Sequence, residues 1–172
     1  VALPSVLIDT ASDADAHDLW SIYTAILRED RWFITYADEF KGTEESQAKA
    51  IRDRNAETNG RLLVARVEGK VVGALSIMGG GLERTRHVGM IELYVERPSR
   101  GKGVGKALME AGLIWAEANP ILRKLALHVF EDNERAVKLY RGLGFAIEGR
   151  LVHEFMEEDG SFRDDLMMAR KV

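Results

Sequence analysis

A glycine-rich segment with basic side chains is the stretch of this chain best suited to chemistry. Glycines stand at positions 101, 103 and 105, and Arg100, Lys102 and Lys106 alternate with them. An apolar run, residues 90–95, precedes the segment, and a helical pattern begins at Val104. Glycines let a backbone approach an anion closely, and the amides at a helix N-terminus point toward it. The segment therefore predicts a phosphate-binding site.

The spacing of these glycines excludes two common phosphate-binding motifs. A Walker loop ending at Gly105-Lys106 requires Gly at position 100 and Ser or Thr at 107, where this chain has Arg and Ala. The dinucleotide fingerprint GxGxxG requires its third Gly at position 106 or 108, where this chain has Lys and Leu. What remains is Arg100-x-x-Gly103-x-Gly105. The alternative is a plain helix start after a flexible loop, although three glycines in five residues cost conformational entropy.

A second motif lies downstream, after one helical pattern and one short apolar run. It reads Asn133-x-x-Ala136-x-x-x-Tyr140-x-x-x-Gly144-Phe145. In spacing and order, the two motifs together resemble the GNAT family of N-acetyltransferases. The resemblance covers roughly residues 62–168. The N-terminal part matches the family only in outline, and in such enzymes that part usually sets the specificity for the acceptor.

The segments around the motifs predict an α+β fold. We expect strands at residues 5–10, 62–67, 71–78, 90–95, 125–130, 145–156 and 162–168, and helices near 13–27, 43–56, 104–118 and 133–143. The third helix should bury one face, made of Val104, Ala107, Leu108, Ala111, Ile114, Trp115 and Ala118. The resemblance implies a mixed, mostly antiparallel sheet of about seven strands flanked by about four helices, in which the strands at 90–95 and 123–130 run parallel and splay apart. We expect one domain over residues 1–172.

The resemblance also implies acetyl-coenzyme A as co-substrate, with its pantetheine arm in the gap between the splayed strands. The arm would contact the backbone of Leu93, Tyr94 and Val95. The pyrophosphate would lie on the amides of Arg100, Gly101, Lys102, Gly103, Val104, Gly105 and Lys106. Asn133 matches a position that contacts the coenzyme, although a simple helix cap explains it equally well.

Acetyl transfer from a thioester to an amine needs a neutral amine, a stabilised oxyanion and a proton for the departing thiolate. Tyr140 is the candidate acid. A phenol's reference pKa of about 10 exceeds a thiol's of about 8.5, so the donor must be well positioned or have a lowered pKa. Glu92, the lone carboxylate among apolar residues 90–95, is the candidate base, acting through water. A strand amide near Leu93 or Tyr94 would hold the oxyanion. The competing structural roles are a core tyrosine and a salt bridge of Glu92.

The acceptor, a primary amine of a small molecule or peptide, is not specified by any motif. Candidate contacts are Asp38 and Glu39, in an aromatic-rich loop at residues 30–41, and Glu154 in the penultimate strand. The histidines stand at 17, 87, 128 and 153 without metal-ligand spacing, so we treat them as ordinary and expect no metal.

Composition limits the functions further. The chain has 172 residues, of which 46% are hydrophobic and 30% charged, as in ordinary globular proteins. The absence of cysteine excludes disulfides and thiolate chemistry, and the net charge of −4 argues against nucleic acid as a partner. No apolar run approaches the roughly 20 residues of a membrane span. We therefore expect a cytoplasmic protein without a membrane or nucleic-acid partner. The resemblance, and not the composition, implies a homodimer, because the C-terminal strands often mediate one in similar proteins.

Two other functions stay open at this point. One is a coenzyme A-binding sensor or interaction module that keeps the fold but has lost turnover. The other is a nucleotide-phosphate-binding protein, for which ATP or NAD would compete with coenzyme A.

Overall fold

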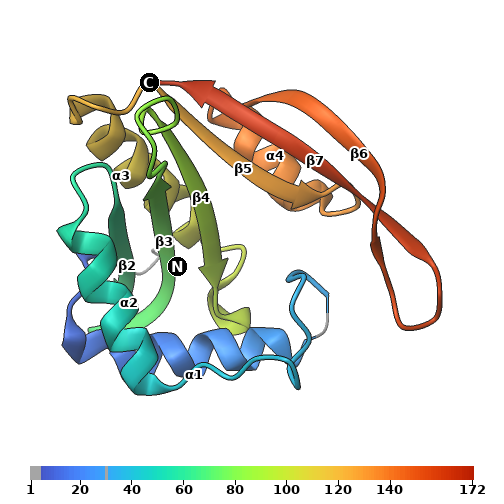
Figure 1. Cartoon of the computed structure of the whole chain (residues 1–172). Helices are drawn as coiled ribbons and strands as arrows, with labels where there is room; N and C mark the ends of the chain where they lie inside the picture. Colours follow the sequence, from blue (N-terminus) through green and yellow to red (C-terminus); the bar gives the residue numbers. More distant parts are fainter. Residues whose placement is uncertain (1–4, 30) are drawn as a thin grey trace.

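The computed structural model describes residues 5–29 and 31–172. Within these residues, seven strands form one mixed sheet in the order β1-β2-β3-β4-β5-β7-β6 (Figure 1). The strands are β1 (Val6–Thr10), β2 (Arg61–Val67), β3 (Lys70–Gly79), β4 (Val88–Val95), β5 (Lys124–Phe130), β6 (Ala146–Met156) and β7 (Phe162–Lys171). Only β4 and β5 pair in parallel; the other neighbours are antiparallel. The predicted sheet is confirmed.

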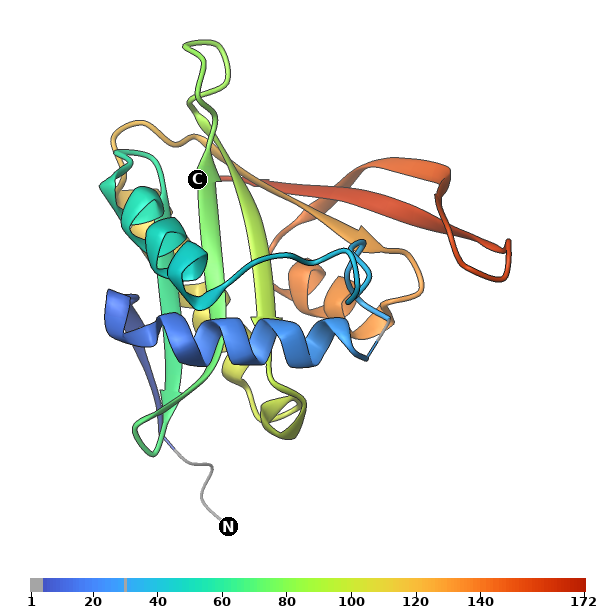
Figure 2. The same cartoon turned by 60° about the horizontal axis from the view of Figure 1, so that its bottom comes forward.

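Four α-helices of the described residues cover the two faces of this sheet (Figure 2). One face carries α1 (Ala16–Leu27) and α2 (Glu44–Ala56), and the other carries α3 (Val104–Ala118) and α4 (Glu134–Gly142). Two short 3-10 turns, Asp13–Asp15 and Arg97–Ser99, precede α1 and the glycine loop. The segment predicted as a loop from residue 30 has its first residue outside the described part, and the rest joins α1 to α2 without a helix or strand.

Local sequence explains where several elements begin and turn. Glu68 and Gly69 both have positive φ, 51° and 81°, which is the conformation of a tight turn between β2 and β3. Thr43 caps α2, and Ser46 completes a reciprocal capping box with it, although the common partner at that position is Glu or Gln. A hydroxyl three residues after the cap is therefore sufficient here.

The predicted face of α3 is wrong in part, because Ile114 is 69% exposed. The buried residues of this helix are Val104, Leu108, Met109, Gly112, Leu113 and Ala116. At Gly112, an added Cβ would lie 2.6 Å from a methyl carbon of Leu75 on β3, so the helix backbone itself touches the sheet there. A prediction from hydrophobic periodicity does not count glycine as a buried residue. The predicted face of α3 was therefore displaced from the residues that contact the sheet.

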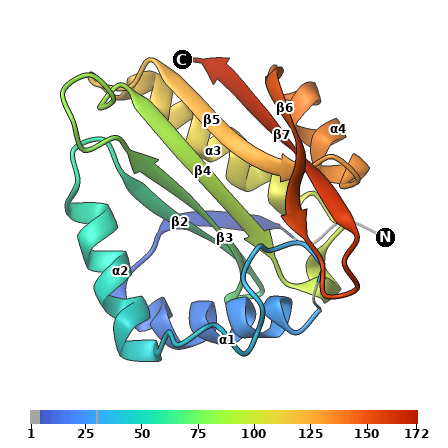
Figure 3. The ribbon, with the colours of Figure 1, turned by 45° about the vertical axis from the view of Figure 1, so that its right-hand side comes forward.

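The pairing of β4 with β5 ends after three residue pairs. Its register is Val88↔Lys124, Gly89↔Leu125 and Met90↔Ala126, and beyond it the two strands separate (Figures 1 and 3). On its other side β4 stays paired with β3 as far as Val95. We call the gap between the separated strands the wedge. The predicted splay is confirmed.

Two hydrogen bonds show which backbone groups of β4 face the wedge. The Glu96 amide donates to the Val72 carbonyl, and the Gly80 amide donates to the Val88 carbonyl. In an antiparallel pair, every second residue of a strand hydrogen-bonds through its backbone to the neighbouring strand. Because Val88 and Glu96 bond to β3, the even-numbered residues of β4 between them do so as well. The peptide groups of the odd-numbered residues Ile91, Leu93 and Val95 consequently point into the wedge.

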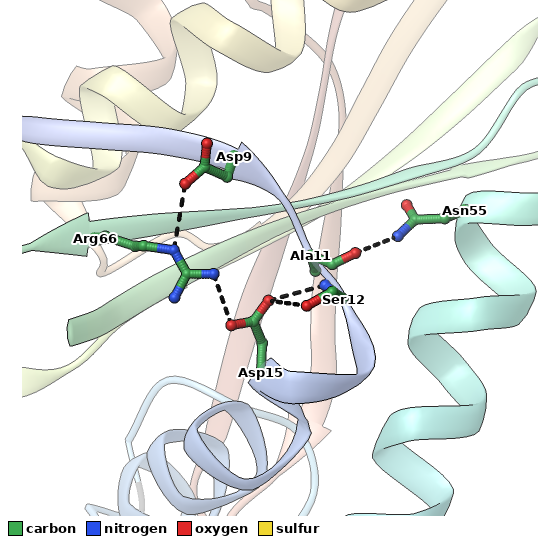
Figure 4. A network of polar contacts seen from close by, with 6 residues as sticks. All are labelled: Asp9, Ala11, Ser12, Asp15, Asn55 and Arg66. Carbon is green, nitrogen blue, oxygen red and sulfur yellow. Dashed lines mark hydrogen bonds and ion pairs between the residues drawn. The ribbon is translucent and has the colours of Figure 1, made fainter. Parts of the chain in front are cut away.

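A buried aspartate fastens the start of α1 to the edge of the sheet (Figure 4). Asp15 is 3% exposed; it accepts hydrogen bonds from the Ser12 amide at 2.8 Å and from Nη2 of Arg66 at 2.7 Å. The Arg66 Nε lies 3.3 Å from Oδ2 of Asp9. Burial works to raise the pKa of Asp15, but the Ser12 amide and the Arg66 guanidinium outweigh it and lower the pKa.

Replacing this carboxylate should destabilise the fold. We expect Asp15→Asn to lower the free energy of unfolding at pH 7 by about 2 kcal/mol, because a buried charge-assisted network loses its negative charge and one of its two acceptor oxygens. Because the folded-state pKa is lowered, the Asp15 contribution is present above the ordinary carboxyl pKa of about 3.9 and is lost as the pH falls below it. Urea unfolding at pH 7 and at low pH measures both effects. Asp9→Asn, at a half-exposed partner of the same arginine, is the matched control and should cost less than about 1 kcal/mol. Equal losses in the two variants would contradict this account.

Candidate active site

Two connected cavities follow the wedge and the glycine loop. The wedge cavity, about 650 Å³, lies between β4 and β5 and has mostly apolar walls; its titratable lining residues are Glu92, Tyr94, Arg100, His128, Tyr140, Glu154 and Asp165. The loop cavity, about 600 Å³, follows the glycine loop to the start of α4. Both cavities are lined by Trp32, Leu93, Tyr94, Val95, Arg100 and Asn133. The two cavities therefore form one continuous path.

The glycine loop presents unpaired backbone amides to the loop cavity. Gly101 and Gly103 have φ of 82° and 85°, in the left-handed region that favours glycine, and Gly103 is the N-cap of α3. No backbone amide from Gly101 to Lys106 has a hydrogen-bond acceptor among the described residues; the first bonded amide is that of Ala107, which donates to Gly103. A row of free amides at a helix N-terminus suits an anionic group such as a diphosphate.

The side chain of Arg100 is bound by groups outside the glycine loop. Its guanidinium makes a two-pronged ion pair with Glu29, at 2.6 and 2.9 Å, and its Nε donates to the carbonyl of Val95 at 2.8 Å. Its own amide donates to Arg97. Arg100 thus joins the end of α1 to the end of β4, and its charge is neutralised by Glu29.

The two lysines of the loop differ in position. Lys106 lines the loop cavity and lies 3.6 Å from Glu110, whereas Lys102 is exposed and does not line that cavity. Asn133 caps α4 by accepting from the Ala136 amide at 3.2 Å. Asn133 also lines both cavities, so the capping role and contact with a ligand are compatible.

Tyr140 places a protonated hydroxyl at the wedge cavity. The residue is 7% exposed and lines that cavity from α4, and its hydroxyl has no hydrogen-bond partner in the part of the chain that the structure describes. Burial raises the pKa of Tyr140 to about 12. Tyr140 therefore does not have the lowered pKa that was one of the two conditions for a proton donor. It can act as the acid only through the second condition, a well-positioned hydroxyl.

Glu92 presents a carboxylate from β4 to the same cavity. Burial raises the pKa of Glu92, although the charge of Arg54 acts in the opposite direction. The Glu92 carboxylate makes no ion pair or hydrogen bond with any other described residue, so the predicted alternative of a structural salt bridge is not found. A raised pKa and a free carboxylate suit a group that accepts a proton.

Aromatic side chains close the wedge on the side of α1. The ring centroid of Tyr23 lies 5.0 Å from that of Phe33, 5.2 Å from Phe40 and 5.6 Å from Tyr94. Burial, followed by the charge of Glu92, raises the pKa of Tyr23 to about 12. Of this cluster, Phe33 and Tyr94 line the wedge cavity together with Glu92.

The loop between α1 and α2 is held across the open end of the wedge by one arginine. Arg163 of β7 donates to the carbonyl of Arg31 at 2.7 Å and pairs with Asp132 at 2.6 Å. Its guanidinium carbon lies 3.6 Å from the centre of the Phe130 ring. Trp32, which lines both cavities, is thereby held beside the β5–α4 turn.

The acceptor residues predicted from the sequence are only partly brought together. Asp38 and Glu39 are exposed and line neither cavity; Glu39 instead accepts from the Tyr36 amide within its own loop. The structure does not bring these two residues to the cavities, and an acidic pair in a loop has no periodicity that reveals its direction. Glu154 does line the wedge cavity.

Sequence reasoning missed one pair in the wedge cavity. His128 Nδ1 lies 2.5 Å from Oδ2 of Asp165, and both residues line the cavity. A polar residue between the core residues Leu127 and Val129 was a signal, but its partner depends on the register of β5 with β7, which the sequence does not display. Among the described residues, no group of three or more His, Asp or Glu could hold a metal ion, and no helix is long and apolar enough to span a membrane.

Together, a row of free amides, an unpaired strand edge and a cavity lined by a carboxylate and a phenol suit a group transferase that uses a long, phosphate-bearing donor. Comparison with known proteins agrees. The model of the Acetyltransferase (GNAT) family matches residues 19–145. The chain therefore belongs to the GNAT family and is an acetyl-coenzyme A-dependent N-acetyltransferase, as predicted.

Individual relatives differ in the acceptor that their names specify. Spermidine N(1)-acetyltransferase of Escherichia coli K12 is 26% identical over 80% of this chain and 70% of its own length. L-amino acid N-acetyltransferase AaaT of the same organism is 33% identical over 63% of this chain and 66% of its own. A GNAT acetyltransferase of Streptococcus pneumoniae superposes with a TM-score of 0.93 at 29% identity, covering 98% of this chain and 100% of its own. A ribosomal-protein-alanine N-acetyltransferase of Brucella melitensis superposes at 0.85 with 28% identity, covering 96% and 99%.

A substitution in the glycine loop should remove coenzyme binding without unfolding the protein. We expect Gly103→Val to abolish measurable binding of acetyl-coenzyme A in calorimetry, because the side chain would occupy the space in front of the free amides. Gly69→Val, in the β2–β3 turn, is the matched control. Both glycines have a φ above 80° and no atom within 4 Å of an added Cβ, so both variants carry a similar backbone strain of about 1–2 kcal/mol. Retained affinity in Gly103→Val, or equal loss in Gly69→Val, would place the coenzyme elsewhere.

Proposed function

We propose that this protein transfers the acetyl group of acetyl-coenzyme A directly to a primary amine of a small molecule or peptide, through a tetrahedral intermediate. The observation that carries the proposal is the continuous path from the free loop amides, along the unpaired edge of β4, to Glu92 and Tyr140. Each part of that path matches one requirement of the reaction.

The coenzyme fits the two connected cavities in one direction, with its phosphates at the glycine loop and its thioester in the wedge. Its pyrophosphate lies on the amides from Gly101 to Lys106, and its pantetheine arm, which carries two amide groups, runs along β4 into the wedge. The Nε of Arg100 already donates a hydrogen bond to the carbonyl of Val95. The Leu93 peptide group and the Val95 amide are thus left for the arm and the thioester.

The oxyanion is assigned to the Leu93 amide. Of the two amides predicted for this role, that of Tyr94 bonds to Ala74 of β3, whereas that of Leu93 faces the wedge. A fixed amide that points to the developing negative charge stabilises the tetrahedral intermediate without reorganisation.

Glu92 and Tyr140 handle the protons. Glu92, through water, takes the proton that converts the acceptor's ammonium group to an amine. Tyr140 gives its proton to the coenzyme sulfur as the carbon–sulfur bond breaks. A phenol with a pKa of about 12 is some 3.5 units less acidic than a thiol, roughly 5 kcal/mol, so the proton moves together with bond cleavage rather than to a free thiolate.

The role of Tyr140 has a direct test. We expect Tyr140→Phe to lower turnover about 10- to 100-fold with little change in coenzyme affinity, because only the proton donor is lost. Steady-state kinetics and calorimetry on the same preparation separate the two quantities. Unchanged turnover would remove Tyr140 from the mechanism. Coenzyme binding without turnover by the wild type, across a broad amine panel, would support the sensor module instead.

The charges of the wedge cavity favour an acceptor without a carboxylate beside its amine. Arg100 is the only arginine among the described residues that line this cavity, no lysine lines it, and Glu29 neutralises Arg100. Glu92, Glu154 and Asp165 supply carboxylates in the same space. A free amino acid would bring its own carboxylate there without a matching cation, whereas an alkylamine or a peptide amine would not.

Matched pairs of acceptors test this preference. We expect leucinamide and phenylalaninamide to be acetylated with at least about 10-fold higher kcat/KM than leucine and phenylalanine, because each pair differs only at the carboxylate. Thiol release measures all four reactions. Equal or better rates with the free amino acids would contradict the proposal and would align this chain with its amino-acid-acetylating relative.

The homodimer remains a prediction. The C-terminal strands expose apolar side chains suited to such an interface: Val152 is 60% exposed, Met156 67% and Phe162 51%.

A further inference from the structure

The wedge cavity contains a histidine–aspartate pair that the proposed mechanism leaves unused. Asp165 is 2% exposed, and the only partner of its carboxylate among the described residues is Nδ1 of His128, at 2.5 Å. The His128 side chain is 46% exposed and lines the cavity. A carboxylate only accepts hydrogen bonds, so a neutral imidazole donates to it from Nδ1. The other ring nitrogen, Nε2, then carries a lone pair and has no partner in the described part of the chain.

His128 and Glu92 stand on opposite sides of the wedge at the same level. The last paired residues are Met90 and Ala126, and two further steps along each strand reach Glu92 and His128. Residues at the same level of neighbouring parallel strands present their side chains to the same face of the sheet. Core packing agrees, because Leu127 and Leu93 pack against the α3 and α4 side, which leaves His128 and Glu92 for the other. Both line the wedge cavity.

The proton balance of the reaction calls for two acceptors. An alkylamine reaches the site as an ammonium ion, since its reference pKa is about 10.4. It loses one proton to become a nucleophile, and its nitrogen loses a second when the tetrahedral intermediate becomes an amide. The thiolate gains one proton, from Tyr140. Glu92 accounts for one of the two protons that leave the nitrogen.

We propose that His128, oriented by Asp165, is the second proton acceptor of acetyl transfer; this inference rests on the proposed function. Glu92 takes the proton of the ammonium ion, and the amine forms its bond to the thioester carbon. As the carbon–sulfur bond breaks, the nitrogen's second proton passes to Nε2 of His128. The sulfur takes the Tyr140 proton. The resulting imidazolium keeps its Nδ1–H bond to Asp165. Of the two protons taken up, one returns to Tyr140 through water and one leaves to solvent.

Other titratable groups around His128 are accounted for. Glu92 of β4 faces it across the wedge, Tyr140 of α4 and Glu154 of β6 line the same cavity, and Asp165 of β7 is its partner. Asp165 acts only through His128, so it is a positioning residue.

Removal of the imidazole tests the proposal. We expect His128→Ala to lower kcat about 100-fold while acetyl-coenzyme A affinity and melting temperature stay near wild-type values, because the side chain is half exposed and Glu92 remains. Added imidazole should restore a substantial part of the rate, and substituted imidazoles should do so in the order of their basicity. His87→Ala, at an exposed histidine that lines neither cavity, is the matched control and should keep the wild-type rate.

The positioning role of Asp165 is tested by its own variant and by the double variant. Asp165→Asn should lower kcat about 10-fold or more with KM for the amine little changed, because the amide favours the wrong imidazole tautomer. The double variant with His128→Ala should be no slower than His128→Ala alone, since Asp165 has no separate role. A merely structural role would make the two losses add and would leave imidazole without effect.

Failure of this inference is distinguishable from failure of the proposed function. Wild-type protein that acetylates no amine overturns both. Wild-type protein that turns over, with His128→Ala at the same rate or without rescue by imidazole, overturns the role of the pair alone and leaves Glu92 as the only base.

Discussion

The structure depends on backbone hydrogen bonds that β4 cannot make. Beyond Met90 its edge loses β5, and the peptide groups of Leu93 and Val95 face a cavity instead of a neighbouring strand. Unpaired backbone groups in a partly buried setting are unfavourable, so such an edge persists only where the rest of the fold holds the strands apart. In the proposed function, the coenzyme arm is the partner that this edge lacks. The separated strands that make the sheet incomplete are thus what creates the binding path.

Two arginines link the ends of the separated strands to the segment around the end of α1. Arg100 stands in the motif for a phosphate site, yet its guanidinium joins Glu29 of the α1 end to the last carbonyl of β4. Arg163 performs a similar task on the β5 side, where it joins the aromatic loop to Asp132. In the proposed function, anion binding is left to the free amides of the loop, which are fixed by the conformations of Gly101 and Gly103.

Local and periodic features were predictable from the sequence. The strands, the four helices, the glycine loop and the Asn133 cap depend on nearby residues, and all were confirmed. Features that depend on side-chain direction or on distant pairing were not: the face of α3 shifted at Gly112, Asp38 and Glu39 lie outside both cavities, and the partner of His128 lies 37 residues away on β7. Such contacts are set by the register of β5 with β7 and by the path of the loop after α1, neither of which leaves a periodic signal.

In the proposed function, the β4 edge and the loop amides together receive the coenzyme. NMR-detected amide exchange with and without acetyl-coenzyme A tests this arrangement most directly. We expect new protection at Leu93, Val95 and Gly101 to Lys106, with little change at Tyr94, whose amide already bonds to β3. Binding that protects other amides, or that leaves Leu93 and the loop exchanging as in the free protein, would contradict it.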